Sequence, residues 1–324
     1  MSLLEIADLR VAFTGGRTVQ AIDGVSLTLD RGEVLALIGE SGSGKSVTLR
    51  TVMRLNPGRT RVTGGIRFED RDVLAMNQRE LRAFRGGEAA MVFQEPLLAF
   101  DPVYTLGAQI IEAIRRHHPV SAAEARARTL ALFERVRIPS PERRLDAYPH
   151  EMSGGMRQRA MIALALSCSP RLLLADEPTT ALDATVQIQI LLLLRELQRE
   201  LGLSIIFVTH DIGAAVEVAD RVAVMYAGRI VEEGSTREIV RSPRHPYTIG
   251  LLHSRAHGAG EAGRRLATIP GAPPDMADPP AGCSFAPRCA FADDGCRAGR
   301  PPLIELSPGR RARCIRLDAV GAAA

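Results

Sequence analysis

Apolar residues follow two kinds of spacing along the chain. In the first quarter, short apolar stretches separated by turn residues predict strands at 4–13, 24–29, 33–39 and 64–70. Between the last two, residues 45–54 have helical spacing, and Asn56-Pro57-Gly58 ends them. This part of the chain therefore predicts a strand, a glycine-rich turn and a helix in succession.

The spacing becomes helical from residue 105 to residue 165 and then alternates. Amphipathic helices are predicted at 106–117, 122–137 and 155–167, as an insertion between α/β segments. After this insertion, predicted apolar strands alternate with predicted helices. The predicted strands lie at 171–176, 203–210, 221–228 and 229–234, with helices at 184–202 and 212–220. Apolar strands alternating with helices predict an α/β fold with a mainly parallel sheet covered on both faces.

After Ser242 the pattern fades. Proline and glycine become dense, as in IPGAPPDMADPPAG, and four of the five cysteines lie in this part of the chain. Such a segment has too few apolar residues to fold well by itself. We therefore predict a large domain at 1–242, with a helical subdomain at about 96–168, and a C-terminal extension at 243–324.

Composition narrows the choice of partners and compartment. A net charge of +4, no tryptophan and 4% aromatic residues do not favour nucleic acid as a partner. The N-terminal residues lack the pattern of a signal peptide, and no apolar run reaches the roughly 18 residues of a membrane-spanning helix. We expect a cytoplasmic protein whose cysteines are reduced thiols or metal ligands.

The segment GESGSGKS, residues 39–46, has the pattern of a phosphate-binding loop, and it lies between a predicted strand and a predicted helix. Gly39, Gly42 and Gly44 let backbone N–H groups, including that of Ser41, surround a polyphosphate. Lys45 can reach the β- and γ-phosphates, and the hydroxyl of Ser46 can bind Mg²⁺. A plain glycine-rich turn is the alternative.

A second acidic motif follows the predicted strand 171–176. Asp176 at the strand end can contribute to the Mg²⁺ shell, and Glu177 can face an attacking water molecule. The two acids could instead cap the turn before Pro178. The phosphate loop predicted in the same sheet favours the catalytic interpretation.

With these motifs, EMSGGMRQR at 151–159 resembles the ATP-binding subunit of ABC transporters. The family signature is LSGGQ, and here Ser153, Gly154 and Gly155 are kept while Met152 and Met156 replace the outer residues. Such replacements are familiar in the peptide-importer branch. The resemblance implies a P-loop NTPase core with an antiparallel β subdomain and a helical insertion.

Other segments match the same family in order and spacing, over residues 3–242. Gln94 resembles the Q-loop glutamine, a ligand of Mg²⁺; residues 181–183 resemble the D-loop with Asp183; and His210 resembles the switch histidine. Phe13 lies where the family places an aromatic residue that stacks on adenine, although an edge-strand core residue is an equal alternative.

The resemblance also implies a mechanism and an assembly. Two ATP-binding subunits, identical or homologous, would enclose ATP between Lys45 and Ser46 of one and Ser153, Gly154 and Gly155 of the other. Glu177, His210 and Gln94 would carry catalysis. Two integral membrane permease subunits would form the pore, and an extracytoplasmic binding protein would deliver the solute. The chain would then lie peripherally on the cytoplasmic face of the inner membrane.

The segment HPYTIGLL at 245–252, LATIPGAPPD at 266–275 and the cysteines resemble the C-terminal extension of ATPases that serve dipeptide, oligopeptide and nickel importers. Peptide import is the leading hypothesis. The alternatives are import of nickel or another small solute, a soluble ABC ATPase without a transport role, and a nucleotide-binding regulator. A single cassette and a short insertion disfavour the soluble classes.

The four C-terminal cysteines, Cys283, Cys289, Cys296 and Cys314, are separated by 5, 6 and 17 residues. These spacings match neither the usual structural zinc pattern nor the ferredoxin pattern. Four thiols in a segment with little core suggest a metal site, and a set of unligated thiols is the alternative. The family resemblance implies a 4Fe–4S cluster, with zinc as second choice.

Overall fold

The structure is a computed structural model, and it describes residues 2–180, 182–256 and 268–321. Its chain divides into two compact units, which are interleaved in sequence. The first unit is built mainly from residues 71–208, and the second from residues 4–28, 35–70 and the chain after residue 208. Ala181 of the expected D-loop and the first two residues of the segment 266–275 lie outside the described residues.

The first unit contains a parallel arrangement of three strands. β7 (Leu172–Asp176) pairs with β6 (Ala89–Val92) on one side and with β8 (Ser204–Thr209) on the other, in parallel register. Every residue of the three strands is buried. Buried parallel strands are the expected result of continuous apolar runs that helices cover.

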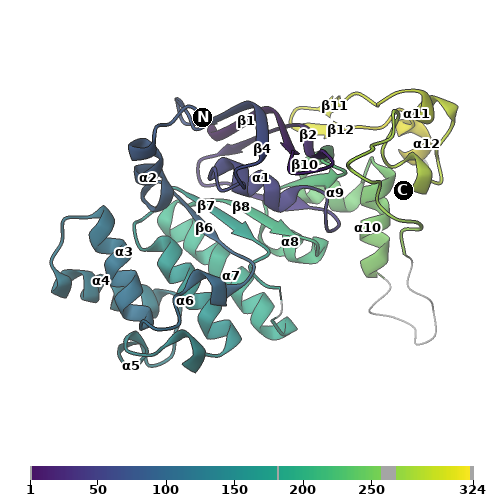
Figure 1. The fold of residues 1–324 in the computed structure, drawn as a ribbon. Helices are drawn as coiled ribbons and strands as arrows, with labels where there is room; N and C mark the ends of the chain where they lie inside the picture. Colours follow the sequence, from purple (N-terminus) through teal and green to yellow (C-terminus); the bar gives the residue numbers. More distant parts are fainter. Residues whose placement is uncertain (1, 181, 257–267, 322–324) are drawn as a thin grey trace. The chain divides into compact units, whose positions relative to one another are not determined.

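A group of helices forms the rest of the first unit. Figure 1 shows α3 (Leu106–His117), α4 (Ala122–Arg135) and α6 (Gly154–Leu166) packed together. The predicted positions of these three helices are confirmed. The other elements are β5 (Arg71–Asp72), α2 (Gln78–Gly87), η1 (Pro96–Ala99), α5 (Pro141–Leu145), η2 (Pro149–Glu151) and α7 (Ala184–Leu201).

The second unit contains the N-terminal strands. β1 (Ser2–Phe13) lies between β2 (Val19–Asp30) and β4 (Thr60–Phe68), and it pairs with β4 in antiparallel register. Alternate residues of β2 and β4 are buried in part of each strand, as in a sheet with one covered face. This is the antiparallel β subdomain that the family resemblance implies.

The second unit also carries the strand that leads into the glycine-rich loop. β3 (Val34–Ile38) pairs in parallel with β9 (Arg221–Tyr226), and β10 (Arg229–Ser235) pairs with β9 in antiparallel register. The remaining helices near these strands are α1 (Lys45–Val52), α8 (Ile212–Val218), α9 (Thr236–Arg241) and α10 (Pro246–Ala256).

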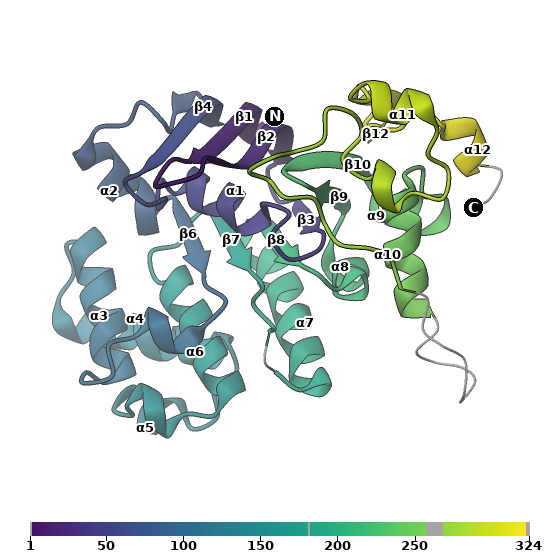
Figure 2. The same cartoon turned by 45° about the vertical axis from the view of Figure 1, so that its right-hand side comes forward.

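The C-terminal segment continues the same sheet. β12 (Arg310–Ala312) pairs with β10, and β11 (Ile304–Ser307) pairs with β12, both antiparallel. Figure 2 shows this segment beside β10 and α10. Its other elements are η3 (Ala286–Arg288), α11 (Asp294–Ala298) and α12 (Leu317–Gly321). We call residues 283–314 the cysteine region. It has little core of its own, but its strands β11 and β12 extend a sheet that β9 and β10 already form.

Candidate functional site

The glycines of the 39–46 loop give the loop a shape that other residues cannot adopt. Gly39 has φ +156°, and a Cβ atom there would lie 2.1 Å from the carbonyl oxygen of Met225. Gly44 has φ +104°, and a Cβ atom there would lie 2.6 Å from the carbonyl oxygen of Ala21. Gly42, at φ +76°, faces open space instead. The loop therefore needs glycine at both ends, as the sequence predicts for a phosphate cradle.

Lys45 begins α1, and its ammonium group is directed back into the loop. Nζ donates to the carbonyl oxygens of Gly39 and Glu40, each at 2.8 Å, and approaches Ser43 Oγ at 3.4 Å. The residue is only 4% exposed. A cation held in this position offers a concentrated positive charge to an anion that enters the loop. Ser46, the second residue of α1, is half-buried.

In the first unit, Asp176 and Glu177 end β7 in different environments. Asp176 is 1% exposed. Glu177 has left-handed backbone geometry, φ +46°, which turns its side chain away from the strand direction. Glu177 Oε2 accepts a hydrogen bond from Thr180 Oγ1 at 2.8 Å and lies 3.4 Å from Gln94 Nε2. The structure therefore brings together Gln94 and Glu177, as expected, and adds Thr180.

The SGG segment lies at the start of a long helix. Ser153 is the N-cap of α6, and its Oγ accepts a hydrogen bond from the N–H of Met156 at 3.3 Å. Gly155 packs so closely that a Cβ atom would lie 2.7 Å from Cγ1 of Val186. Asp183 caps α7 by accepting from the N–H of Val186 at 2.9 Å. Ser153 and Asp183 are both exposed, so the two caps are accessible from outside this unit.

The other expected site residues lie in the second unit. Phe13 ends β1 and is half-buried, opposite Thr60 of β4. His210 is exposed and directly follows β8, before Asp211, which caps α8. The expected ATP-site residues are thus divided between the two units. Phe13, the glycine-rich loop and His210 belong to the second unit, and the remaining residues belong to the first.

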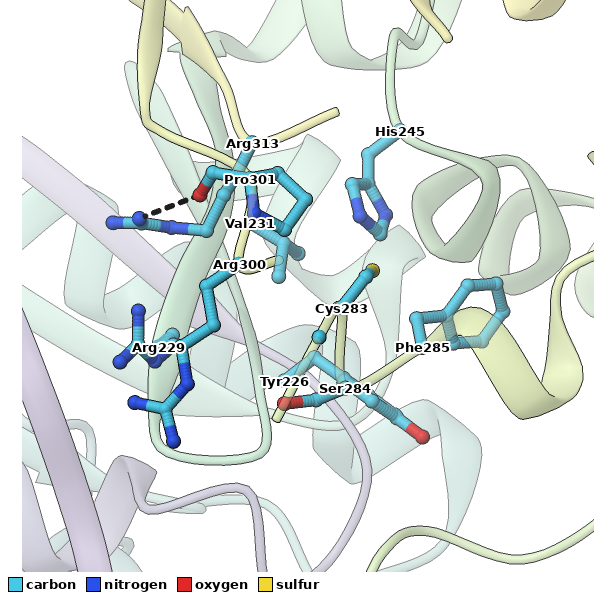
Figure 3. Close-up of a pocket in the computed structure, with 11 residues that line it drawn as sticks. Tyr226, Arg229, Val231, His245, Cys283, Ser284, Phe285, Arg300, Pro301 and Arg313 are labelled. Carbon is cyan, nitrogen blue, oxygen red and sulfur yellow. Dashed lines mark hydrogen bonds between the residues drawn. The ribbon is translucent and has the colours of Figure 1, made fainter. Parts of the chain in front are cut away.

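The four C-terminal cysteines line one small cavity, together with His245 and Phe285. Figure 3 shows the adjoining pocket, where the thiol of Cys283 points toward the His245 ring. Within residues 2–180, 182–256 and 268–321, however, no group of three or more His, Cys, Asp or Glu side chains could hold a metal ion. The four cysteines line the same cavity, and the metal stays a prediction.

Hydrogen bonds to sulfur are a second property of this cavity. The N–H of Phe291 donates to Cys289 Sγ at 3.4 Å, and the N–H of Arg316 donates to Cys314 Sγ at 3.3 Å. In each case the donor lies two residues after the cysteine. Backbone N–H groups aimed at sulfur stabilise a thiolate, which is the form of cysteine that binds metals.

Burial acts in the opposite direction on the same thiols. It is the main cause that raises the pKa of Cys314 to about 11, and it also raises the pKa of Cys283 and Cys289. Negative charge on neighbouring cysteines would raise these pKa values further. Without a nearby cation these thiols are therefore protonated at neutral pH, and a metal would supply that cation.

His245 beside the cavity is a neutral histidine. Complete burial, with a smaller contribution from the charge of Arg313, lowers its pKa to about 3. Its Nδ1 accepts a hydrogen bond from the N–H of Tyr247 at 3.1 Å. Tyr247 in turn packs against Tyr226 and Phe285, with ring centroids 4.6 and 5.5 Å away. The cysteine cavity is thus bordered by a rigid aromatic group.

Three contacts at the site were not predicted from sequence. Arg288, next to Cys289, forms an ion pair with Glu40 of the glycine-rich loop. Tyr247 OH accepts a hydrogen bond from the N–H of Glu40 at 2.7 Å, and Thr180 binds Glu177. Glu40 occupies a variable position of the loop pattern, so the pattern itself contains no signal for these contacts. Only Thr180, three residues after Glu177, was close enough in sequence to be suspected.

Comparison with known proteins gives matches along most of the chain. Residues 22–180 match the family model described as ABC transporter, and residues 231–296 match the model described as oligopeptide/dipeptide transporter, C-terminal region. The second match includes Cys283, Cys289 and Cys296. No helix in the described part of the chain is long and apolar enough to cross a membrane.

Similar curated proteins extend over nearly the whole chain. A probable peptide ABC transporter ATP-binding protein, y4tR of Sinorhizobium fredii, is 48% identical over 98% of this chain and 96% of its own length. The oligopeptide transport ATP-binding protein OppD of Bacillus subtilis is 48% identical over 94% of this chain and 86% of its own length.

Solved structures share the fold over a smaller part. The ATP-binding cassette MJ0796, a dimer in a post-hydrolysis state bound to ADP and Pi, is 28% identical with a TM-score of 0.65, and it covers 72% of this chain and 99% of its own. The cbiO1 protein of Clostridium perfringens, part of the transporter complex cbiONQ, is 28% identical with a TM-score of 0.64 and covers 74% of this chain and 90% of its own. The predicted α/β fold of an ABC ATPase is confirmed.

Proposed function

Since this chain belongs to the ABC transporter family, we propose that it is the ATP-hydrolysing subunit of a peptide importer. The observation that carries this proposal is the match of residues 231–296 to the C-terminal region of oligopeptide and dipeptide transporters. That segment lies outside the ATPase motifs and is specific to the type of importer. Full-length relatives named for peptide import support the same solute class.

In this function the glycine-rich loop binds the phosphates of ATP. Backbone N–H groups of the loop, that of Ser41 among them, surround the phosphates, and the buried Lys45 ammonium lies beside them. Ser46, Gln94 and Asp176 hold Mg²⁺, whose charge stabilises the phosphate oxygens when it is bound. Phe13 provides the surface for adenine, and its half-buried ring supports that role.

Glu177 acts as the general base that activates water for attack on the γ-phosphate. Its Oε2 accepts a hydrogen bond from Thr180 Oγ1 and lies near Gln94 Nε2. These two contacts fix the orientation of the carboxylate that receives the proton. Asp176 is buried and would serve as a ligand of Mg²⁺, whereas Glu177 would act as the base. His210 contacts the γ-phosphate in the closed state, consistent with its exposed position after β8.

A second ATP-binding subunit completes the site. The exposed cap of α6, with Ser153, Gly154 and Gly155, covers the phosphates of ATP bound to the partner, and Asp183 lies at the same surface. The dimeric state of the similar cassette MJ0796 supports this arrangement. The partner subunit is either identical or homologous to this chain.

Membrane subunits are the next partners that the proposal requires. Large apolar side chains are exposed next to Gln94 on one stretch of the first unit, at Phe93, Leu97, Val103 and Tyr104. An exposed apolar group of this kind fits helices of two integral membrane permease subunits. The chain then works at the cytoplasmic face of the membrane, and an extracytoplasmic binding protein supplies the peptide.

Replacement of the general base tests the catalytic assignment. In the assembled transporter, we expect Glu177→Gln to keep ATP binding and to reduce the rate of ATP hydrolysis by a factor on the order of 10² or more. Glu200→Gln, at the exposed end of α7, is the matched control and retains full activity. Undiminished hydrolysis by Glu177→Gln contradicts the assignment. Uptake of a radiolabelled dipeptide, measured in parallel, tests the solute class.

The C-terminal cysteines hold a 4Fe–4S cluster with a structural role in this proposal. The shared cavity of Cys283, Cys289, Cys296 and Cys314 and the N–H groups directed at sulfur support thiolate ligation. Zinc is the second choice, because four thiolates suit that ion as well. Anaerobic purification with iron and acid-labile sulfide analysis tests this, and colourless protein with one zinc ion overturns it.

A further inference from the structure

Arg288 is a buried cation in the middle of the cysteine region, between Pro287 and Cys289. Its side chain is only 5% exposed. The guanidinium binds Glu40 with both ends, Nη1 to Oε2 at 2.8 Å and Nη2 to Oε1 at 3.0 Å. The remaining N–H groups are directed to the carbonyl oxygens of Pro270 and Ile269 and to the hydroxyl of Tyr226. All five donors of the guanidinium are therefore used.

Glu40 is the second residue of the glycine-rich loop, and each of its polar groups is occupied. The carboxylate receives Arg288, the backbone N–H donates to Tyr247 OH at 2.7 Å, and the backbone carbonyl accepts from Lys45 Nζ at 2.8 Å. The peptide units on both sides of the Glu40 Cα atom therefore have fixed orientations. In a phosphate-binding loop, backbone N–H groups such as that of Ser41, which follows Glu40, are the donors to phosphate.

The contact also lies within a rigid surrounding. The rings of Tyr226, Tyr247 and Phe285 pack together with centroid distances of 4.6 to 5.5 Å. The guanidinium carbon of Arg288 lies 5.8 Å from the centroid of the Tyr226 ring. Because the buried Arg288 uses all five of its donors in these contacts, we expect a displacement of the cysteine region to displace Glu40 as well.

We propose that Arg288 is a positioning residue for ATP binding: through its bidentate ion pair with Glu40 it holds the phosphate loop in its binding shape, so that the order of the cysteine region sets the affinity for ATP. The inference rests on the proposed function of the loop as an ATP site. It does not depend on the identity of any metal in the cysteine region.

The physical basis is preorganisation. A loop that is already held in its bound shape loses less conformational freedom when ATP arrives, and ATP therefore binds more tightly. A bidentate arginine–carboxylate pair has a defined geometry that a lysine cannot reproduce. The affinity for ATP thus depends on the planar, bidentate guanidinium of Arg288 and not on its charge alone.

The test uses the full-length chain assembled in its transporter, with Arg288→Lys, Glu40→Gln and the double variant. We expect each single change to weaken the binding of Mg-ATP about tenfold and to raise KM by a similar factor, while kcat stays within about twofold. The double variant is expected to be no worse than either single variant, because both remove the same contact. Arg297→Lys, an exposed arginine of the same region, is the matched control.

Reciprocal coupling gives a second measurement that a loss of stability alone would not produce. If the cysteine region sets ATP affinity, then ATP must stabilise the cysteine region. We expect saturating Mg-ATP to slow hydrogen exchange of residues 283–296 in the unchanged chain and to have no such effect in Arg288→Lys. Thermal unfolding of each variant checks that it is folded.

Several results would overturn the proposal. These are wild-type affinity in Arg288→Lys, additive effects in the double variant, or hydrogen exchange at 283–296 that does not respond to ATP. Failure of the unchanged chain to bind Mg-ATP would instead overturn the proposed function. The two failures are therefore distinguishable by the same set of titrations.

Discussion

The glycine-rich loop and the cysteine region lie in the same unit but are held in different ways. β3, which leads into the loop, is buried at every residue, and the loop takes its shape from backbone geometry at Gly39 and Gly44. In the cysteine region most residues of β11 and β12 are not buried. Arginine side chains hold that region instead, through the ion pairs Arg288–Glu40, Arg300–Asp23 and Arg311–Glu233.

Because the two regions are held differently, they should respond differently to substitutions and to solution conditions. Steric restrictions on a backbone do not depend on pH, salt or redox state, whereas charged hydrogen bonds and thiols do. We therefore expect the fold of the loop to fail through substitutions that add volume, whereas loss of the Arg288–Glu40 ion pair weakens ATP binding in a loop that is still folded. The cysteine region should fail through substitutions of its aromatic anchors and through titration of its ion pairs.

The largest effect is expected from Gly39→Ala. The added Cβ atom would meet the Met225 carbonyl oxygen at 2.1 Å, in a backbone conformation that alanine rarely adopts. We expect a loss of at least about 3 kcal/mol in the free energy of unfolding and no measurable binding of ATP. Denaturant unfolding and an ATP titration measure the two effects.

Gly42→Ala is the control for that prediction, since its Cβ atom would meet nothing within 4 Å. Only the strain of its φ of +76° remains, and we expect a loss of about 1–2 kcal/mol. Equal effects at Gly39 and Gly42 would mean that close packing does not determine the shape of the loop.

An intermediate effect is expected from Phe285→Ala, which removes the aromatic anchor of the cysteine region. Phe285 is 4% exposed and packs on Tyr226 and Tyr247. We expect about 3 kcal/mol of destabilisation, confined to the cysteine region. Hydrogen exchange should accelerate at residues 283–314 and stay unchanged in β7.

The exposed Ile315 provides the matched control, and Ile315→Ala is expected to cost less than about 1 kcal/mol. If Phe285→Ala accelerated exchange equally in β7, the cysteine region would not be a separately responding part of the chain. The glycine-rich loop and the cysteine region would then not differ in how they are held.

The smallest effect is expected from the ion pairs at Asp23. Burial alone would raise the pKa of Asp23, but Arg229, Arg10 and Arg300 outweigh it and lower the pKa below its ordinary value. The stabilisation is therefore present above the ordinary aspartate pKa and is lost as pH falls through the lowered, folded-state value. We expect Asp23→Asn to cost about 1–2 kcal/mol at neutral pH and to flatten this acid dependence.

Denaturant unfolding between pH 7 and pH 3 measures that contribution. Asp294→Asn is the control, because Asp294 is exposed and its ion pair with Arg297 lies at the surface. A stability difference between Asp23→Asn and the unchanged chain that does not shrink at low pH would contradict the assignment.

The parts predicted well from sequence are those with a strong local pattern. The loop at 39–46 has a strand before it and a helix after it, and α3 and α7 follow clear helical spacing. In these segments the same residues specify both the element and its buried face, so tertiary contacts changed only a few end residues.

The parts that escaped prediction have weak or distant signals. α2 is strongly polar, with only Leu81 and Phe84 buried, and it contains non-helical geometry at Arg85 and Gly86. β6 is a four-residue strand that contains two alanines. The contact between Arg288 and Glu40 joins residues 248 positions apart, and no local pattern contains that information. The domain boundaries and the roles of the site residues stay predictions.

Glu40 also has a consequence for how such chains can be recombined. A motif search treats its position as interchangeable, yet its carboxylate is the acceptor for an arginine near the other end of the sequence. A chimera that exchanges the C-terminal region between two paralogues must therefore carry residue 40 along with it. Otherwise the buried guanidinium of Arg288 is left without its counter-charge, and the chimera is destabilised although each parent protein is stable.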